Sequence, residues 1–592
     1  MRAHTWLIVV LTACGSTHGG DDDDDTAPGP FDACGGKIVK ADGTIDGAEY
    51  VRQAGLWDRD AIDCRLGPKY DAYHPGDADL ARPTAADMPT FQHTGNLCPQ
   101  FFNHDTAGPA TYGSTSGQVA YAPDDPADHG LDRVQTAGWE GAGQCWLPLV
   151  NNELHSAHPD QSIKEWLGKS LTPGVPIAKG RTDHAETGDG IMIFSNGLVG
   201  ATGTQTSRPG DGPHPTLQLP PNKVPTAIAL SNYNEFAVIT VWDTDALKGQ
   251  LAVVVLRAPD PDQHSVNAFA APNEGGFDQV QLLGYIDLPD MATPTSVAFA
   301  GNNQGHNGPW VQCNCDHAYQ GVGGIFHDLG YDQMIANTAN WVWISDPTMG
   351  PGFFANAGGA IVASQWENKV TFVDFTPLFQ FVRKVYVDPI ANHTDQELYT
   401  QAISSTPWPF DFTTNPEMMP TVVTTVPVTA PRAVRYGIHP TPNAPGLRSK
   451  LLAWVATLDG TLAAYDLATF TQVGSVMTDP NPTQLRLAND NDGLIVVSRG
   501  NRSVQWVATS ESSIDVTETF RDSHVDDPVA IDRNQRMPVI TIGDFSSGQV
   551  FGFERDDASC TTAGPVQTCA YKYEGAMMYP GAVYMIDTAN VN

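Results

Sequence analysis

The chain has 592 residues, which is long enough to bury a large core and to form more than one structural unit. Its 67 acidic and 32 basic residues give a net charge of −35. Such a charge argues against nucleic acid as a partner, because phosphate binding needs clustered Lys and Arg. The 56 Gly and 45 Pro residues are typical of strands that alternate with turns.

The N-terminus has the layout of a secretory signal. Arg2 supplies a positive start, an apolar run covers residues 6–11, and small residues precede Cys14. The run is shorter than the roughly 20 apolar residues that a membrane span needs, and no later segment approaches that length and apolarity. Leu11-Thr12-Ala13-Cys14 resembles the lipobox of bacterial lipoproteins. The resemblance implies a signal peptide at 1–13 and lipid, such as palmitate, on Cys14; the alternative is an ordinary signal peptide with a chance cysteine.

We therefore expect a lipid-anchored protein of the cell envelope, held to its membrane by the lipid because anionic lipid surfaces repel an acidic chain. Gly15 stands where inner-membrane lipoproteins of enteric bacteria carry an aspartate, and this comparison favours the outer membrane. Residues 14–30 include five consecutive aspartates and little that could be buried. This segment is predicted to be a disordered, extended tether.

The range 31–185 is predicted to be an irregular, disulfide-braced region with a short helix at 161–169. Eight cysteines remain after Cys14, and an even number in an exported chain favours disulfides. Sequential pairing would join Cys34 to Cys64 and Cys98 to Cys145, but the sequence does not choose among the connectivities.

The pair Cys560 and Cys569 is the clearest candidate for a local disulfide. The two residues flank a turn-rich loop that contains Gly564-Pro565. A turn at this point would bring the two cysteines opposite each other.

From residue 186 to residue 592 the pattern changes to short apolar strands separated by turns, which predicts an all-β architecture. A loose repeat recurs, in which a proline opens a strand with alternating apolar residues. Three or more strands follow most of these prolines at a spacing near 50 residues, as in the blades of a β-propeller. The repeat begins at Pro225, Pro294, Pro431, Pro482 and Pro528.

The last strand, after Pro580, is predicted to close the ring. It repeats the opening pattern with no blade after it, whereas residues 190–202 form a hairpin without an opening strand. Pairing these two fragments would remove the exposed edges of an open circular sheet.

The strand ends Val241-Trp-Asp, Val373-Asp-Phe and Ala464-Tyr-Asp resemble those of YVTN-type propellers, within the quinoprotein-dehydrogenase-like and lactonase-like group. Six blades can be counted, and the resemblance favours seven, with the seventh in 300–358 or 388–430. A further strand is expected at 381–387. The resemblance implies a fold and no particular activity, because one fold hosts many functions.

Two groups of residues are candidate metal sites. Cys313, Cys315 and His317 could bind copper or zinc, although a disulfide fits an oxidising compartment better. Asp490 and Asp492 precede a glycine as in the start of a calcium loop, and a simple turn is the alternative.

No sequence signature of a catalytic site is evident: the chain lacks a serine-hydrolase elbow, a phosphate-binding loop and a haem-attachment motif. Charged residues near the blade openings are candidates for the central mouth, with structural salt bridges as the alternative; they are Arg432, Arg435, Arg486 and Asp532. We therefore predict a scaffold that binds an extracellular protein or glycan. The alternatives are a propeller enzyme, either a lactonase-like hydrolase or an oxidoreductase, and a copper- or metal-binding envelope protein.

Overall fold

The fold was analysed in a computed structural model. The structure describes residues 115–123, 134–139, 176–180, 190–194, 197–202, 216–231, 235–243, 245–246, 248–256, 280–301, 355–365, 367–386, 388, 396–404, 408–437, 445–487, 493–533, 539–578 and 581–588.

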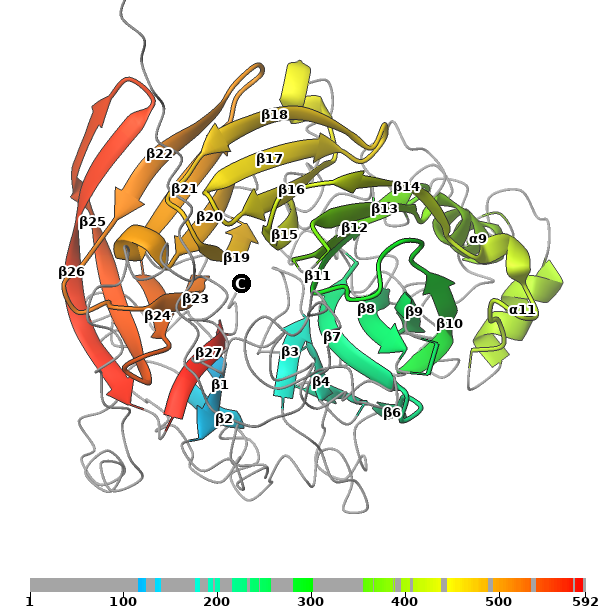
Figure 1. The fold of residues 1–592 in the computed structure, drawn as a ribbon. Helices are drawn as coiled ribbons and strands as arrows, with labels where there is room; N and C mark the ends of the chain where they lie inside the picture. Colours follow the sequence, from blue (N-terminus) through cyan, green and yellow to red (C-terminus); the bar gives the residue numbers. More distant parts are fainter. Residues whose placement is uncertain are drawn as a thin grey trace, which may run out of the picture.

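Six antiparallel sheets of four strands make up most of the described residues. They surround a common centre as the blades of a β-propeller (Figure 1). In chain order the sheets contain β3 (Pro176–Gly180), β4 (Gly190–Phe194), β5 (Leu198–Thr202) and β6 (Thr216–Gln218); β7 (Lys223–Leu230), β8 (Phe236–Asp243), β9 (Lys248–Val255) and β10 (Gln281–Asp287); β11 (Ser296–Gly301), β12 (Gly358–Ser364), β13 (Lys369–Asp374) and β14 (Thr421–Pro427); β15 (Pro431–Gly437), β16 (Leu452–Thr457), β17 (Thr461–Asp466) and β18 (Thr471–Met477); β19 (Pro482–Leu487), β20 (Gly493–Ser498), β21 (Ser503–Thr509) and β22 (Ile514–Phe520); and β23 (Pro528–Arg533), β24 (Val539–Asp544), β25 (Gln549–Ala563) and β26 (Val566–Met578).

A seventh sheet joins the two ends of the described chain. It contains three strands in the order β2 (Val134–Trp139), β1 (Thr115–Pro123) and β27 (Gly581–Thr588). The all-β propeller prediction is therefore confirmed, and the described residues form seven sheets. The range 388–430, one of the two predicted places for a seventh blade, supplies β14 to another sheet, and most of the other, 302–354, lies outside the described residues.

The predicted partner of the last strand is wrong. Strand β27 pairs with β1, and the hairpin at 190–202 receives its opening strand from β3. The segment of β3 was missed because it has five residues and ends in Lys179-Gly180, which breaks the apolar alternation. A Cβ at Gly180 would lie 2.4 Å from Leu230 Cδ1, so β3 packs closely on the side chains of β7 at this point. Three propeller strands thus lie within 31–185, where an irregular region was predicted.

Proline marks the start of the innermost strands, which are the strands nearest the centre in Figure 1. Five of them show a register shift directly after their first proline, at Pro176, Pro225, Pro431, Pro482 and Pro528. Proline has no N–H to donate to the ladder, and a bulge at this point leaves the next residue without a direct partner.

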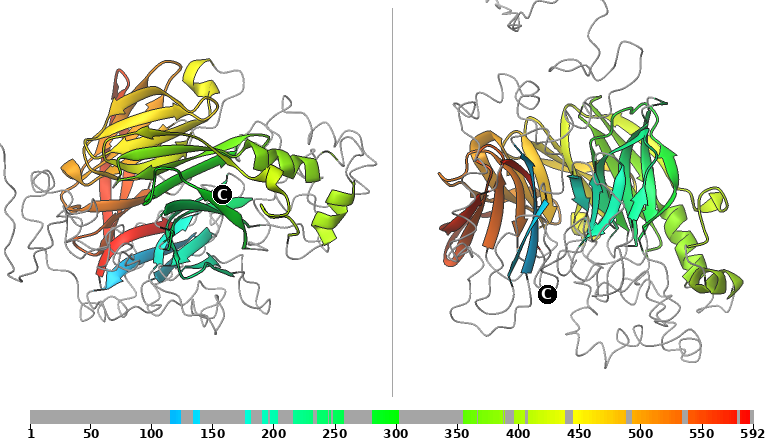
Figure 2. Two further views of the ribbon diagram at one scale, coloured as in Figure 1. Left: turned by 45° about the vertical axis from the view of Figure 1, so that its right-hand side comes forward. Right: turned by 90° about the horizontal axis from the view of Figure 1, so that it is seen from below.

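The predicted strand at 381–387 is wrong, because most of this segment belongs to helix α9 (Thr376–Tyr386). Leu378, Phe381, Val382 and Val385 are buried and follow helical spacing. Proline at the second position also suits a helix start. Helices α9 and α11 (Gln396–Ser404) lie at the outer side of the ring (Figure 2). The remaining helical segments are η7 (Pro416–Met418), η8 (Gly446–Ser449) and η9 (Gly500–Arg502).

The hydrophobic core lies within and between the sheets. The side chains of Trp242 and Trp454 are fully buried in it, and that of Trp506 is nearly so. Among the described residues no helix is long and apolar enough to cross a membrane.

The closing sheet offers a test of the ring. Ile586 of β27 is buried and lies opposite Val119 of β1. We expect Ile586→Ala to cost about 3 kcal/mol, the usual effect of truncating a buried isoleucine. The loss should appear as a lower unfolding midpoint and as faster hydrogen exchange in β1. Met477→Ala, at an exposed residue of β18, is the control and should change neither quantity.

Candidate functional site

In the sequence, a proline stands within two residues of the start of each innermost strand, and the residue after this proline is an equivalent position in the seven sheets. These residues are uncharged in six sheets, and Arg432 of β15 is the exception; the others are Ile177, Thr226, Thr295, Thr483, Val529 and Gly581. The bulge after Pro431 places Arg432 outside the regular ladder of β15. A single guanidinium therefore stands in a neutral ring of equivalent positions.

Arg432 is half-buried, and its partner is neutral. Its Nη1 donates to Oε1 of Gln365 at 2.7 Å, and Gln365 directly follows β12 in the neighbouring sheet. No carboxylate among the described residues pairs with it. Burial, and after it the positive charge of Arg499, lower the pKa of Arg432 to about 10, so it remains protonated at neutral pH. The guanidinium thus keeps donors and a positive charge that the described residues do not neutralise.

Arg499, by contrast, is neutralised by a carboxylate. It follows β20 and is fully buried, as is its partner Asp527, which precedes Pro528. Nη2 lies 2.5 Å from Oδ2 of Asp527, and Nε binds the other carboxylate oxygen. The guanidinium carbon also lies 5.5 Å from the ring centroid of Phe545. This bidentate pair connects the β19–β22 sheet with the β23–β26 sheet.

Asp544, at the end of β24, lies beside this pair. Its carboxylate accepts N–H bonds from Asp526 at 2.8 Å, from Asp527 at 2.6 Å and from Ser547 at 2.9 Å. Burial, and then the negative charge of Asp527, raise the pKa of Asp544 above its ordinary value. The carboxylate therefore holds the backbone that presents Asp527 to Arg499.

The other predicted residues of the blade openings occupy one level of the propeller. Arg435, Arg486 and Asp532 lie opposite Trp454, Ile495 and Thr541, three equivalent positions in successive sheets. The guanidinium carbon of Arg435 lies 5.1 Å from the ring centroid of Tyr436. Arg435 and Arg486 both make interactions within the structure, as Arg432 does with Gln365.

The strand-end aspartates have structural roles. Asp243 Oδ1 accepts the N–H groups of Asp245 and Ala246, both at 3.1 Å. Asp374 accepts the N–H of Thr376, and Asp466 accepts that of Ala468, both at 2.9 Å. These carboxylates stabilise turns, as short acceptor side chains commonly do.

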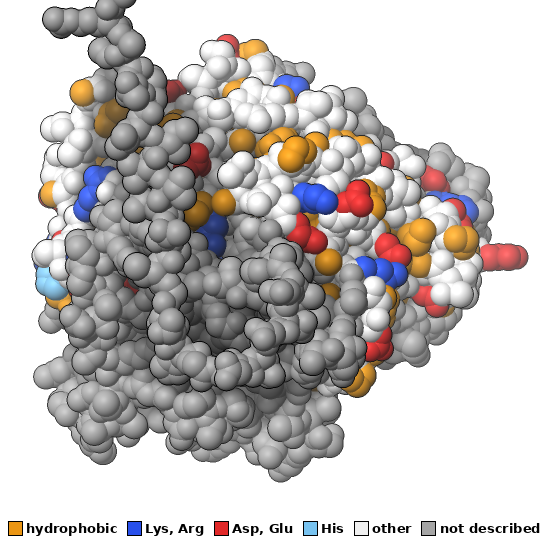
Figure 3. Space-filling view, in the orientation of Figure 1, with side chains coloured by type: hydrophobic (Ala, Val, Ile, Leu, Met, Phe, Trp, Pro, Cys, Tyr) orange, Lys and Arg blue, Asp and Glu red, His pale blue; other side chains and the backbone are white. Residues whose placement is uncertain are grey.

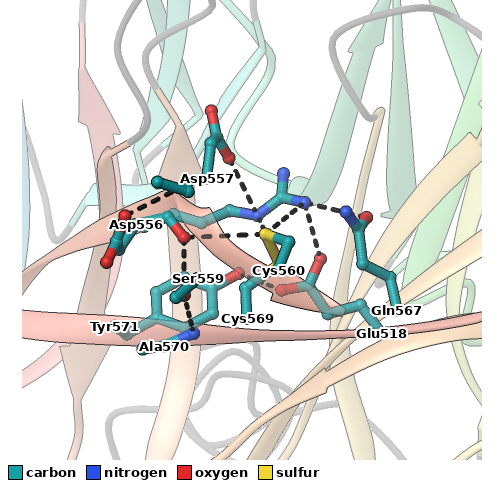
Figure 4. The surroundings of a disulfide bond; sticks show 11 residues. Glu518, Asp556, Asp557, Ser559, Cys560, Gln567, Cys569, Ala570 and Tyr571 are labelled. Carbon is teal, nitrogen blue, oxygen red and sulfur yellow. Dashed lines mark hydrogen bonds and ion pairs between the residues drawn. A yellow bond between two sulfur atoms is a disulfide. The ribbon is translucent and has the colours of Figure 1, made fainter. Parts of the chain in front are cut away.

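The predicted disulfide between Cys560 and Cys569 is present. It links the two strands of the β25–β26 hairpin, which extends beyond β24 (Figures 1 and 4). Arg555 lies against the sulfur atoms, with its Nε 3.3 Å from Sγ of Cys569. Its Nη2 lies 3.3 Å from Oε2 of Glu518 on β22 of the adjacent sheet. The hairpin is thereby held to that sheet by an ion pair.

The remaining predicted sites lie outside the described residues: Cys14, Cys34, Cys64, Cys98, Cys145, Cys313, Cys315, His317, Asp490 and Asp492. Within the described part of the chain, no three His, Cys, Asp or Glu side chains are arranged to hold a metal ion.

No family model matches the chain, and no curated protein is significantly similar to it. Solved structures share its fold at low identity. The periplasmic gluconolactonase of Pseudomonas aeruginosa is 11% identical with a TM-score of 0.43, covering 81% of this chain and 100% of its own. A protein from Lactobacillus plantarum is 10% identical with a TM-score of 0.40, covering 81% of this chain and 100% of its own. Sqt1 from Saccharomyces cerevisiae is 9% identical with a TM-score of 0.35, covering 69% of this chain and 75% of its own. These similarities concern the β-propeller fold alone.

The buried ion pair can be tested by a mutant cycle. Arg499→Met leaves Asp527 buried without its cation, and we expect a loss of about 3–5 kcal/mol in unfolding free energy. The double variant Arg499→Met/Asp527→Leu should recover most of that loss, because no buried charge remains unpaired. Denaturant unfolding of the two single variants and the double variant measures the coupling, and additive losses would contradict the pairing.

Proposed function

We propose that the protein is a binding scaffold of the cell envelope whose propeller takes an anionic ligand at Arg432. The observation that carries the proposal is a half-buried guanidinium with a neutral partner, Gln365, and no carboxylate partner among the described residues. A partly desolvated cation binds an anion more strongly than an exposed one, since water competes less. Gln365 adds an amide group beside the guanidinium. Lipid on Cys14 and attachment to the outer membrane complete the proposal, supported by the N-terminal sequence.

The overall charge limits the size of the anion. A net charge of −35 repels polyanions. Physiological salt screens this repulsion over a distance of about 8–10 Å, so it acts close to the surface. On the face shown in Figure 3, described Lys and Arg side chains form small groups, several of them beside acidic side chains. The ligand that fits is therefore a molecule with one anionic group, such as an acidic sugar of a glycan or a single carboxylate of a protein.

Calorimetric titration with galacturonate, gluconate and inorganic phosphate, with neutral glucose as the comparison, tests this function. We expect binding of an anion but not of glucose. Arg432→Gln should weaken it roughly 10- to 100-fold, since a charge-assisted hydrogen bond contributes about 1.5–3 kcal/mol.

The matched control is Arg502→Gln. Arg502 is also partly exposed, but it pairs with Asp526 and should not be needed for the ligand. Equal binding by wild type and Arg432→Gln, or no binding of any of the three anions, would refute the proposed function.

A further inference from the structure

The disulfide lies where the β25–β26 ladder is interrupted. Pairing runs from Gln549–Met578 to Asp556–Ala570 and resumes at Thr561–Thr568. Residues 557–560 of β25 therefore face Cys569 alone, and the Cys560–Cys569 bond replaces the missing ladder. Both cysteines are half-buried, whereas most residues around them are exposed. The bond is thus within reach of a small reagent.

The surroundings of the two sulfur atoms differ. Arg555 Nε is 3.3 Å from Sγ of Cys569, while its Nη2 is 3.8 Å from Sγ of Cys560. Sγ of Cys560 lies 3.6 Å from the carbonyl oxygen of Asp556. The guanidinium beside Cys569 is a charged donor and favours a thiolate at that sulfur. The carbonyl oxygen beside Cys560 is an acceptor and favours a protonated thiol there.

Carboxylates also face Arg555, and their burial decides how strongly they compete. Glu518 is nearly fully buried, lies 3.3 Å from Nη2 and also accepts the Tyr571 hydroxyl at 2.7 Å. Asp557 lies 3.4 Å from Nε but is largely exposed, so water screens it. Gln567 accepts from Nη2 at 2.9 Å. Figure 4 labels the two cysteines and these three acceptors. Glu518 is therefore the main competitor for the charge of Arg555.

We propose that Cys560–Cys569 is a thiol–disulfide exchange site that accepts electrons from a small dithiol. A thiolate of the dithiol attacks Sγ of Cys560, the Cys560–Cys569 bond breaks, and Cys569 leaves as a thiolate beside Arg555. The second thiol of the reagent then displaces Cys560, which takes up a proton. The protein gains two thiols, and the reagent becomes a cyclic disulfide.

Reduction would loosen the outer part of the hairpin and leave its base in place. The tip, residues 557–568, would lose the covalent link that spans the interrupted ladder. The base keeps Tyr571 against Phe520, with ring centroids 4.7 Å apart, and against Trp506 at 6.0 Å. The exchange therefore changes a local surface and leaves the ring intact.

The experiment is a timed reduction of the full-length mature protein by dithiothreitol at pH 7, followed by iodoacetamide and peptide mass spectrometry. In the partly reduced wild type we expect Cys569 to be alkylated roughly tenfold faster than Cys560. Hydrogen exchange should rise in 557–568 and stay unchanged in β23 and β24.

Three variants test the role of Arg555. Arg555→Gln should slow reduction roughly tenfold and remove the difference between the two cysteines. Glu518→Gln should speed reduction, since the competing charge is gone. Lys572→Gln, which removes an exposed charge on β26, is the control and should behave as wild type.

Three results would overturn the proposal: equal alkylation of the two cysteines in the wild type, an unchanged rate in Arg555→Gln, or reduction that requires denaturant. Should Arg555→Gln fail to fold, the acceleration in Glu518→Gln decides, and its absence refutes the role of Arg555.

Discussion

The pairing of β27 with β1 is the contact on which the rest of the propeller depends. Strand β27 lies beside β23 and brings the last segment of the chain into a sheet with strands that come more than 440 residues earlier. Around the ring, side chains bind the backbone of the next sheet: Thr226 donates to the carbonyl of Pro294 at 2.7 Å, and Gln484 accepts the N–H of Ile531 at 2.6 Å. These bonds join neighbouring innermost strands around the centre.

Two arginines on neighbouring sheets show how burial separates structure from function. Arg499 is fully buried and neutralised, and removing one partner would leave a buried charge without compensation. Arg432 is only half-buried and has a neutral partner, so an external anion can supply what Asp527 supplies to Arg499. In our proposal the arginine side chain therefore serves folding in one place and binds a ligand in the other.

The propeller fold could be predicted because its signals are local and repeated. A proline followed by alternating apolar residues recurs at Pro225, Pro431, Pro482 and Pro528. The last three are the first residues of their strands in the structure, and Pro225 is the third residue of β7. The closing strands could not be predicted in the same way. Strand β3 ends in Lys179-Gly180, and nothing in the sequence of β27 specifies β1 as its partner, since pairing across hundreds of residues is set by the closed ring.

The candidate sites show the same division. The Cys560–Cys569 bond followed from a short loop, and Arg432 followed from its place after Pro431. Gln365 and Glu518 had no signal of their own, because each matters only through a residue on a neighbouring sheet. Asp527 could have been found by aligning the repeats, which places it directly before Pro528, next to the strand start.

The β19–β22 and β23–β26 sheets are joined by ion pairs at two distances from the centre. Arg499 and Asp527 join them on the inner side, fully buried, and Glu518 and Arg555 join them on the outer side. The second of these sheets also contacts β27 of the closing sheet, so this interface lies next to the point where the ring would open. Neither residue of the inner pair belongs to the hairpin that carries the disulfide. The hairpin with its disulfide can therefore change without opening the propeller, because the Arg499–Asp527 pair and the bond between Gln484 and Ile531 join the two sheets independently of it.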